Sequence, residues 1–273
     1  MNDSNLRILA IGAHPDDCEA TCAGVAAKWA KRGHVVRFVS ATDGGTGHHE
    51  MGGAALVRRR IAEARAAADV IGIESQVLPI PNGQIEPNLA YRAMFVRLIR
   101  EFAPDLVLTH RPNDYHPDHR YTSQLVQDAA YIVTVPNNGP SAPALRRDPV
   151  IAYMADNFQR PAPLRPDFVI DIDDVYDAKI EVLHQHVSQF YEWIPWHDGI
   201  AAGVPKEEGA RRKWLKEWWS PRDTSRADKY REQLVARYGA SRGPSVKHAE
   251  AFEVCEYGAG AGDARLAQLF EGM

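Results

Sequence analysis

The sequence predicts an α/β fold: a Rossmann-like, doubly wound, mostly parallel sheet with helices on both faces and an aromatic-rich C-terminal extension. Strand and helix signals alternate through the first half of the chain, as parallel sheets with helical crossovers require. Polar clusters follow two apolar runs, and large aromatic side chains crowd one later segment. A chain of 273 residues can bury a sizeable core. We expect one domain over residues 1–273, with a sheet core in 1–135 and later strands, a helix and the extension in 136–273.

The individual elements are predicted from apolar periodicity and from the residues that end each run. The first strand is continuously apolar, which suits burial on both faces of a sheet. Gly33 and Gly72 end two helices, and Pro104 stops a third. The expected strands are residues 7–12, 35–41, 76–80, 105–109, 150–154 and 168–172. The expected helices are residues 19–32, 54–71, 88–102, 119–133, 174–191 and 264–270.

Imidazole and carboxylate side chains follow two of these strands. Residues 14–17 read His-Pro-Asp-Asp after the first strand, and residues 114–119 read Asp-Tyr-His-Pro-Asp-His after the strand at 105–109. In doubly wound order these two strands are neighbours at the topological switch point, where ligands bind. Alone, the first run is as typical of a turn or a helix cap, and the second of exposed histidines. Their convergence favours a catalytic zinc site, which has three protein ligands and an open position.

The motifs themselves resemble those of a known family. Residues 13–19, Ala-His-Pro-Asp-Asp-Cys-Glu, and residues 116–119, His-Pro-Asp-His, are similar to the metal motifs of the PIG-L/LmbE-like zinc-dependent N-deacetylases. Residues 60–63 and 186–189 add supporting matches. That family includes deacetylases of N-acetylglucosaminyl conjugates in phosphatidylinositol-glycan, mycothiol and bacillithiol synthesis. The resemblance implies a hydrolase that removes an N-acetyl group from an N-acetylated amino sugar or related small amide, with one Zn²⁺ per subunit.

The resemblance also implies roles for the first cluster and for the end of the second. His14, Asp17 and His119 correspond to the zinc ligands, and Asp16 to the general base. Independently, adjacent loop residues cannot both point comfortably at one ion, so one of Asp16 and Asp17 is expected to face the water. Zinc lowers the pKa of bound water to about 7, which allows hydrolysis near neutral pH without a covalent nucleophile.

His116 is expected to stabilise the oxyanion of the tetrahedral intermediate. This role matches the family's use of the first histidine of His-Pro-Asp-His, and we expect the neighbouring Asp118 to hold the His116 tautomer. A second metal ligand or a simple loop histidine are the alternatives for His116.

Four further residues are expected to contact the substrate: Arg60, Asp114, His48 and His49. Arg60 matches an arginine that reaches substrate hydroxyls in the family, although neighbouring arginines also make an exposed helix position plausible. Asp114 lies where relatives have a polar substrate-contacting residue. His48 and His49 belong to the glycine-rich loop 42–53, which departs from the family's short turn. We expect a flexible lid or specificity loop, since no Lys-Ser/Thr follows its glycines as in a nucleotide loop.

The composition of the chain limits the binding partners and the cellular compartment that we expect for this protein. A net charge of −4 and a pI near 6.3 give no indication of a nucleic-acid surface. Three cysteines form no disulfide framework, and no apolar run reaches membrane-spanning length, so we expect a cytoplasmic protein with no membrane partner. Cys18 and Cys22 are more typical of small buried side chains than of a second metal site.

Large aromatic residues are unusually dense between positions 190 and 219. They are Phe190, Tyr191, Trp193, Trp196, Trp214, Trp218 and Trp219. We expect the first two tryptophans near the cleft and the last three, which share a helical face, in a homo-oligomer contact. A satellite core under a long loop is the alternative.

Other functions compete with N-deacetylation. An amidase that cleaves a larger acyl group would use the same chemistry. A Rossmann-type nucleotide-binding or methyl-transfer protein is disfavoured, because residues 12–16, Gly-Ala-His-Pro-Asp, are not a G-x-G-x-x-G loop and their carboxylate would repel phosphate. A structural metal module would need a closed four-ligand site, whereas these clusters hold more acid–base groups than zinc can bind.

Overall fold

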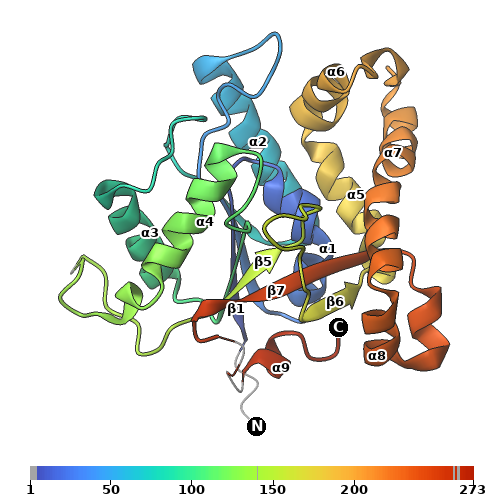
Figure 1. Ribbon diagram of the computed structural model, residues 1–273. Helices are drawn as coiled ribbons and strands as arrows, with labels where there is room; N and C mark the ends of the chain where they lie inside the picture. Colours follow the sequence, from blue (N-terminus) through green and yellow to red (C-terminus); the bar gives the residue numbers. More distant parts are fainter. Residues whose placement is uncertain (1–4, 140, 261, 263–264) are drawn as a thin grey trace.

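One seven-stranded sheet with the order β3-β2-β1-β4-β5-β7-β6 organises the computed structural model (Figure 1), which describes residues 5–139, 141–260, 262 and 265–273. The strands are β1 (Arg7–Gly12), β2 (Val35–Ser40), β3 (Glu74–Val77), β4 (Leu106–Thr109), β5 (Val150–Met154), β6 (Phe168–Asp171) and β7 (Ala249–Gly258). Neighbouring pairs from β3 to β5 are parallel, and β7 runs antiparallel between β5 and β6. The sheet thus takes strands from both halves of the chain.

The helices connect and cover these strands. They are α1 (Asp17–Lys31), α2 (Gly53–Ile71), α3 (Leu89–Phe102), α4 (Pro117–Ala129), α5 (Tyr176–Gln185), α6 (Ile194–His197), α7 (Glu208–Lys229), α8 (Arg231–Arg242) and α9 (Leu266–Leu269). A π-helix, η3 (Ser188–Trp193), and the 3₁₀ turns η1 (Ile132–Thr134), η2 (Asp173–Val175), η4 (Ala201–Gly203) and η5 (Gly243–Ser245) complete the described elements. Within the described residues, none of the helices is both long and apolar enough to cross a bilayer.

Helices pack on both faces of the sheet, as predicted. One buried cluster joins the sheet to α1 and α5, and includes Trp29, Ile180 and Phe190. A second cluster, with Phe95 and Leu125, joins the opposite face to α3 and α4. Figure 1 shows α3 and α4 on one side of the strands and α1, α2 and α5 on the other. The doubly wound fold is therefore confirmed.

The topological switch point lies where the sequence predicted it. β1 pairs in parallel with β2 on one side and with β4 on the other, and Ile11 lies opposite Thr109. α1 begins at Asp17, shortly after β1, and α4 begins at Pro117, after the loop 110–116 that follows β4. The two polar clusters therefore share one edge of the sheet.

Several elements differ from the prediction. β7 was not predicted, because glutamates interrupt its apolar pattern. Glu250 is nevertheless fully buried; its carboxylate accepts hydrogen bonds from the backbone N–H groups of Gly24 and Val25 and pairs with Lys179 at 2.9 Å. The expected helix 174–191 ends at Gln185 and continues as the π-helix η3. The first residue of the expected helix 264–270 lies outside the described residues.

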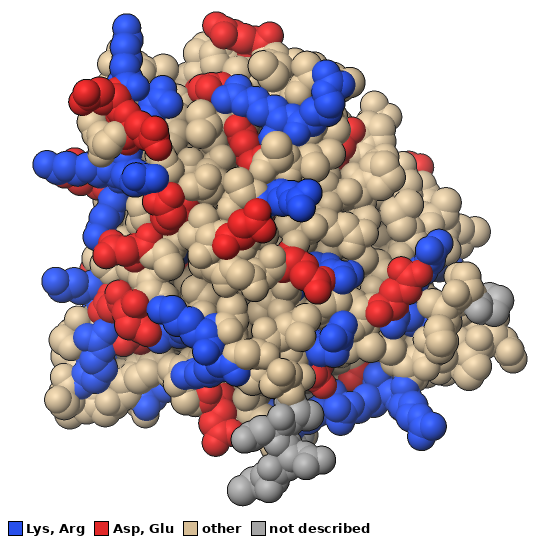
Figure 2. Space-filling model, turned by 180° about the vertical axis from the view of Figure 1, so that it is seen from behind, with Lys and Arg blue, Asp and Glu red and all other residues tan. Residues whose placement is uncertain are grey.

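The outer surface carries charges of both signs. On the face shown in Figure 2, basic and acidic side chains alternate rather than forming one large patch of a single sign. This distribution accords with the small net charge of −4.

Candidate active site

The first polar cluster lies in a tight turn between β1 and α1. The backbone N–H groups of Asp16 and Asp17 both point at the carbonyl oxygen of His14, at 2.9 and 3.3 Å. Asp16 has φ 157° and ψ −18°, a conformation that L residues rarely adopt and that is found preferentially at functional sites. The turn sends the two carboxylates to different partners.

Asp17 is fixed through one of its oxygens. Its Oδ2 accepts hydrogen bonds from the backbone N–H groups of Ala13 at 2.9 Å and His14 at 2.7 Å. Its Oδ1 lies 3.5 Å from Nε2 of His119. Two backbone donors therefore hold the carboxylate while Oδ1 faces the second cluster.

The second cluster is built on the N-terminus of α4. Pro117 occupies the first turn, where its missing N–H costs nothing. His116 is the N-cap, and its Nδ1 accepts a hydrogen bond from the backbone N–H of Asp118 at 3.1 Å. Asp114 accepts from the backbone N–H of His116 at 2.9 Å. This capped start directs His119 toward β1.

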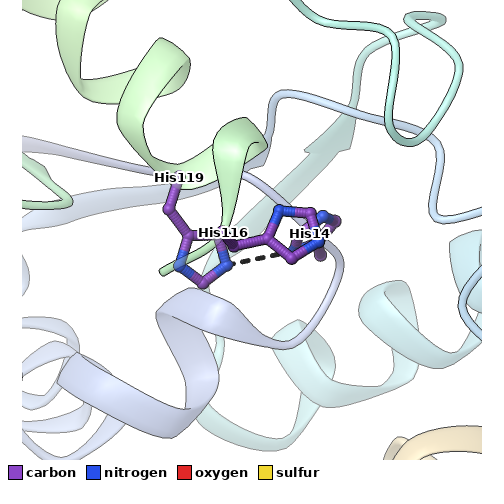
Figure 3. A group of neighbouring side chains, drawn as sticks. All are labelled: His14, His116 and His119. Carbon is purple, nitrogen blue, oxygen red and sulfur yellow. Dashed lines mark hydrogen bonds between the residues drawn. The ribbon is translucent and has the colours of Figure 1, made fainter. Parts of the chain in front are cut away.

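The predicted ligand set comes together at this edge of the sheet, and Figure 3 shows its two histidines, His14 and His119, beside His116. Nδ1 of His14 lies 3.2 Å from Nε2 of His119 and 3.4 Å from Oδ2 of Asp17. A tetrahedral ion with ligand bonds of about 2.0–2.1 Å has ligand atoms about 3.3–3.4 Å apart. Nδ1 of His14 and Nε2 of His119 therefore have the spacing of two ligands of a tetrahedral divalent cation such as Zn²⁺. The Asp17 carboxylate lies beside them, with Oδ2 near His14 and Oδ1 near His119.

Other combinations of the same side chains also meet the distance requirement for a metal. Among the described residues, His14, His116 and His119 form one group of potential ligands, and Asp17, His110 and His119 form another. The ligand atoms within each group lie within 4.8 Å of one another. His119 belongs to both groups.

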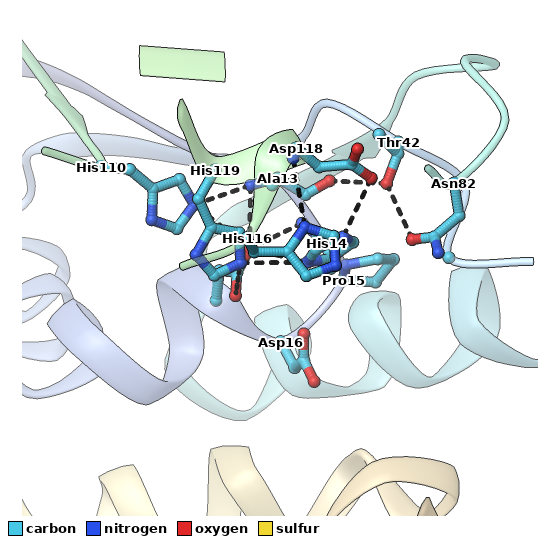
Figure 4. Close-up of polar contacts among 12 residues, drawn as sticks. Ala13, His14, Pro15, Asp16, Thr42, Asn82, His110, His116, Asp118 and His119 are labelled. Carbon is cyan, nitrogen blue, oxygen red and sulfur yellow. Dashed lines mark hydrogen bonds and ion pairs between the residues drawn. The ribbon is translucent and has the colours of Figure 1, made fainter. Parts of the chain in front are cut away.

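Each candidate ligand histidine contacts a carboxylate, and Figure 4 shows the pair of His14 with Asp118. Nε2 of His14 lies 3.2 Å from Oδ2 of Asp118, which also accepts from the backbone N–H of Gly83 at 2.7 Å. Nδ1 of His119 lies 3.1 Å from Oδ2 of Asp114. Carboxylate–histidine pairs of this kind orient metal ligands and raise their basicity.

One expectation is corrected by these contacts. The carboxylate of Asp118 faces His14 and does not hold the His116 tautomer; the backbone N–H of Asp118 does that instead. Asp114 faces His119 and is not among the residues that line the cavity, so its contact with substrate stays a prediction. Both aspartates act on neighbours that chain adjacency alone does not identify.

His110 was not predicted, although it directly follows β4. It is buried, stacks on His119 with ring centroids 4.0 Å apart, and brings Nε2 within 3.2 Å of Oδ2 of Asp17. Ser123 donates to its carbonyl oxygen at 2.7 Å. Its position at a strand end beside the second cluster was the available signal.

Neighbouring groups shift the pKa values of His14 and Asp17 in opposite directions. Burial lowers the pKa of His14, but hydrogen bonds to Asp118 and Asp17 outweigh it and raise the pKa to about 9. Burial raises the pKa of Asp17, yet the nearby His119 and His110 hold it well below its usual range. Metal binds the neutral imidazole, so loading this site would release the His14 proton.

His116 is set up as a neutral hydrogen-bond donor. Burial lowers its pKa, and the adjacent charges of His14 and His119 lower it further. Because Nδ1 accepts from a backbone N–H, the ring proton of the neutral form resides on Nε2. His116 lines the cavity, where this proton is available to a bound group.

Asp16 and Arg60 form a pair at the same cavity. Nη2 of Arg60 lies 3.1 Å from Oδ1 of Asp16 and 2.8 Å from the carbonyl oxygen of Pro15. Burial raises the pKa of Asp16, and the charge of Arg60 opposes that shift. His186, which is fully buried, brings Nε2 within 3.2 Å of Glu19 and sits behind this pair. Arg60 is buried rather than an exposed helix arginine.

The two loop histidines lie elsewhere. Nε2 of His48 lies 2.9 Å from Glu192, and His49 stacks on Trp196 with ring centroids 4.8 Å apart. Arg59 donates to both carboxylate oxygens of Glu192, at 2.7 and 2.6 Å. Neither histidine is among the residues that line the cavity; they join the loop to η3 and α6, and their contact with substrate stays a prediction.

A cavity of about 690 Å³ opens over the cluster. The imidazoles and carboxylates form one part of its wall, and loop 42–53 contributes Thr46 and Gly47. η3 and α7 contribute Phe190, Trp193 and Trp219. Trp193 lies at the cleft as predicted, and Trp196 stacks against it with ring centroids 5.4 Å apart. Trp219 also lines the cavity, although we expected it in an oligomer contact.

Comparison with known proteins identifies the family. The PIG-L model, described as GlcNAc-PI de-N-acetylase, matches residues 9–130. Diacetylchitobiose deacetylase of Thermococcus kodakarensis is 30% identical over 216 residues, which cover 75% of this chain and 80% of that protein. The chain belongs to the PIG-L/LmbE-like family. A 4-oxalmesaconate hydratase of Pseudomonas putida is 25% identical over 215 residues, covering 74% of this chain and 83% of that protein.

Solved structures share the fold. A 4-carboxy-2-hydroxymuconate hydratase from Pseudomonas putida superposes with a TM-score of 0.71 at 20% identity, covering 91% of this chain and 96% of that chain. N,N′-diacetylchitobiose deacetylase from Pyrococcus horikoshii superposes with a TM-score of 0.69 at 23% identity, covering 91% of this PIG-L chain and 83% of that one.

Proposed function

We propose that this PIG-L family member is a zinc-dependent N-deacetylase acting on an N-acetylated amino sugar or related small amide. One observation carries the proposal: the facing nitrogens of His14 and His119 lie 3.2 Å apart, and the Asp17 carboxylate brings Oδ2 within 3.4 Å of the first and Oδ1 within 3.5 Å of the second, beside a cavity that Asp16 and His116 also line. The 30% identity to a diacetylchitobiose deacetylase supports an N-acetylated sugar as substrate.

The proposed metal ligands, Asp16 and His116 each carry out a different part of the proposed reaction. Zinc, when bound by His14, Asp17 and His119, supplies a Lewis acid that lowers the pKa of water to about 7. Asp16 accepts the proton of the attacking water and returns it to the departing amine as the C–N bond breaks. Burial raises the pKa of Asp16, which brings the base closer to the working pH. Nε2–H of His116 donates to the oxyanion that forms on the amide carbonyl.

Asp16→Asn tests the assignment of the general base. The substitution keeps the side-chain volume but removes the proton acceptor, so amine release should fall by roughly 10²- to 10⁴-fold while zinc content stays at the wild-type level. Amine release from N-acetylglucosamine glycosides and zinc content by atomic emission are measured in parallel.

Asp69→Asn, an exposed position on α2, is the matched control and should behave as wild type. Loss of zinc by Asp16→Asn, with activity restored by added metal, would instead mean that Asp16 and Asp17 exchange roles.

A hydratase is the second candidate function. The similarity to 4-oxalmesaconate hydratase over 83% of that protein favours it, because the same acid–base groups could add water to a carbon–carbon double bond. Assaying amine release and the ultraviolet absorbance of an unsaturated oxo-acid separates the two. An amidase for a larger acyl group would prefer N-hexanoyl over N-acetyl glycosides.

We further propose a homo-oligomeric protein that works in the cytoplasm on a small-molecule substrate. Cys18, Cys22 and Cys255 are free and buried, which suits a reducing compartment. Trp214 and Trp218 remain partly exposed on the outer helix α7, which supports a contact with a second subunit.

A further inference from the structure

A serine, a histidine and an aspartate form a chain of hydrogen bonds outside the metal cluster. Oγ of Ser220 lies 3.0 Å from Nε2 of His248, and Nδ1 of His248 lies 2.8 Å from Oδ1 of Asp173. Ser220 belongs to α7, His248 directly precedes β7, and Asp173 lies in η2. None of these three described residues is among those that line the cavity over the metal cluster. Their order is that of a serine nucleophile, its general base and the carboxylate that orients the base.

Asp173 fixes the tautomer of His248. Its carboxylate also accepts hydrogen bonds from the backbone N–H groups of Lys247 at 3.0 Å and His248 at 2.8 Å. Burial raises the pKa of Asp173, but these donors and the His248 side chain outweigh it, so the carboxylate stays ionised near neutral pH. The ring proton of neutral His248 therefore resides on Nδ1, beside the carboxylate. Its Nε2 is left to accept the hydroxyl proton of Ser220.

The ring of Tyr176 holds the imidazole of His248 from one face. The two rings stack with centroids 3.6 Å apart and planes 9° apart. Stacking and the contact with Asp173 together fix the plane and the rotation of the imidazole, so Nε2 stays directed at Ser220. A general base needs this orientation before its substrate arrives.

The hydroxyl of Tyr176 is a hydrogen-bond donor close to the serine. It is buried and, among the described residues, makes no hydrogen bond of normal geometry. Burial raises the pKa of Tyr176 and the charge of Asp223 raises it further, whereas the side chain of Ser220 lowers it, so Ser220 lies near this oxygen. A buried donor without a partner calls for an explanation, and an incoming carbonyl oxygen supplies one.

The constellation is partly open to solvent. The side chain of His248 is 15% exposed and that of Asp173 is 19% exposed, and Ser220 is half-buried. This partial exposure allows a small acyl group to reach Ser220 from solvent. It also keeps the base and its carboxylate mostly shielded, which strengthens the contact between them.

We propose that Ser220, His248 and Asp173 form a second catalytic site, which transfers a short acyl group from an aryl ester to water. Oγ of Ser220 attacks the ester carbonyl while Nε2 of His248 takes the hydroxyl proton. The bond to the aryl oxygen then breaks, and His248 gives that proton to the leaving phenol. The hydroxyl of Tyr176 donates to the oxyanion.

Hydrolysis of the acyl-serine completes the cycle. His248 takes a proton from water, whose oxygen attacks the acyl carbon. The bond from that carbon to Oγ of Ser220 breaks, the carboxylic acid leaves, and His248 returns the proton to Oγ. The inference is independent of the proposed function, because no metal ligand takes part in these steps.

An alkyl fluorophosphonate tests the reactivity of Ser220 in the whole protein. The bond from Oγ to phosphorus forms, the P–F bond breaks, fluoride leaves with the serine proton, and peptide mass spectrometry locates the adduct. Ser220 should be labelled at least about 100-fold faster than Ser225, because general-base assistance contributes roughly 10²- to 10⁴-fold. Ser225 is the matched control, since it is exposed on the same helix. Unfolding in urea should reduce labelling of Ser220 to the rate of Ser225.

The ester 4-nitrophenyl acetate tests the acyl transfer itself. Wild type should release nitrophenol faster than Ser220→Ala, and Ser225→Ala should match wild type. Any hydrolysis at the metal cluster is common to all three proteins and cancels in the differences. His248→Gln should slow both ester hydrolysis at Ser220 and its phosphonylation by roughly 10²-fold or more, with circular dichroism showing that the variant is folded.

Two results would overturn the inference. One is labelling of Ser220 in folded wild type no faster than labelling of Ser225. The other is equal ester hydrolysis by wild type and Ser220→Ala. Either result would leave the contacts among Asp173, His248 and Ser220 as a purely structural connection between η2, β7 and α7. Both comparisons use proteins that retain His248, so they decide the matter even if His248→Gln does not fold.

Discussion

Two carboxylate–imidazole pairs set the orientation of the candidate metal ligands: Asp118 with His14 at 3.2 Å, and Asp114 with His119 at 3.1 Å. Removing the charge of either carboxylate leaves the ligand in place but weakens its orientation and basicity. Asp118→Asn and Asp114→Asn should each weaken zinc affinity by roughly 10- to 100-fold. Competition with a chromophoric chelator measures this effect.

Asp128→Asn is the matched control, because it makes the same chemical change further along α4, where Asp128 accepts a hydrogen bond from Gln124 and contacts neither histidine ligand candidate among the described residues. Wild-type zinc affinity in both test variants would show that these aspartates do not support the metal site.

Alanine substitutions distinguish the histidines of the cluster by their effect on zinc content. His14→Ala and His119→Ala remove a ligand each, so zinc content should fall far below wild type. His116→Ala should retain the metal and lose activity, because its Nδ1 is committed to the helix cap and its Nε2–H faces the cavity. Metal analysis of the three purified variants gives the answer.

Loss of zinc in His116→Ala as well as in His14→Ala and His119→Ala would favour the alternative group in which His116 is a ligand. Stoichiometric zinc in both His14→Ala and His119→Ala would contradict the proposed site altogether.

At the scale of single residues, the sequence predicted which side chains lie close together at the site, but it did not predict every contact between two of them. The position of His14 after β1 and that of His119 in the segment after β4 were sufficient, because parallel strands bring their carboxyl ends to one edge. Asp118 follows His116 closely in the chain, yet the first turn of α4 directs its carboxylate to His14. Contacts between the loop after β1 and the segment after β4 depend on the direction in which each side chain points. The spacing of residues in the sequence does not reveal that direction.

At the scale of elements, one carboxylate ties the start of β7 to the end of β6. Asp173 in η2 accepts hydrogen bonds from the backbone N–H groups of Lys247 and His248 and pairs with Arg242 at 2.8 Å. Burial raises the pKa of Asp173, but these donors and the side chain of His248 outweigh it, so its pKa is lowered. The ionised group therefore stabilises the folded state.

Asp173→Asn should lower the free energy of unfolding by about 1 kcal/mol at pH 7, after allowance for solvent screening. A lowered folded-state pKa stabilises above the unfolded value of about 3.9, and that stability is lost as pH falls through the folded-state pKa. The difference between wild type and variant should hold from pH 7 to 5 and close below about pH 4. Urea unfolding at each pH measures it.

Asp174→Asn is the control, since its exposed pair with Lys28 at 2.6 Å contributes little. A difference that persisted unchanged to pH 3 would rule out the charge of Asp173 as its origin.

The same region shows where element prediction fails. β7 carries Glu250 into the core, and a glutamate there is tolerated only because Lys179 and two backbone N–H groups of α1 surround it. Those partners are remote in sequence. A strand whose polar residue is neutralised by distant elements has no local pattern that reveals it.

At the scale of the whole molecule, the alternation of strands and helices was enough to predict the doubly wound sheet and the adjacency of β1 and β4. The segment after β6 was harder, because η3, α6 and α7 leave the sheet and pack on one another (Figure 1). Phe190 and Tyr191 join the core, and Trp193 and Trp219 line the cavity. One aromatic-rich segment thus serves more than one purpose.

The oligomer contact is therefore expected to involve Trp214 and Trp218 rather than Trp219. Their rings stack at a centroid separation of 5.1 Å on α7, and both stay partly exposed. Burying these indoles against a second subunit would remove apolar surface from water at roughly 25 cal/mol per Å². Wild type should sediment at a multiple of its 30.4 kDa chain mass, and the double variant Trp214→Ala/Trp218→Ala at a lower mass.

Trp196→Ala is the control for loss of an exposed indole. Trp196 is 50% exposed, and it belongs to α6, whereas Trp214 and Trp218 belong to α7. It should leave the sedimenting mass unchanged. Circular dichroism confirms that each variant is folded, since Trp214 also packs near Tyr191 at 6.0 Å. A wild-type protein that sediments as a monomer, or a folded double variant of unchanged mass, would leave Trp214 and Trp218 as part of a satellite core of a single chain.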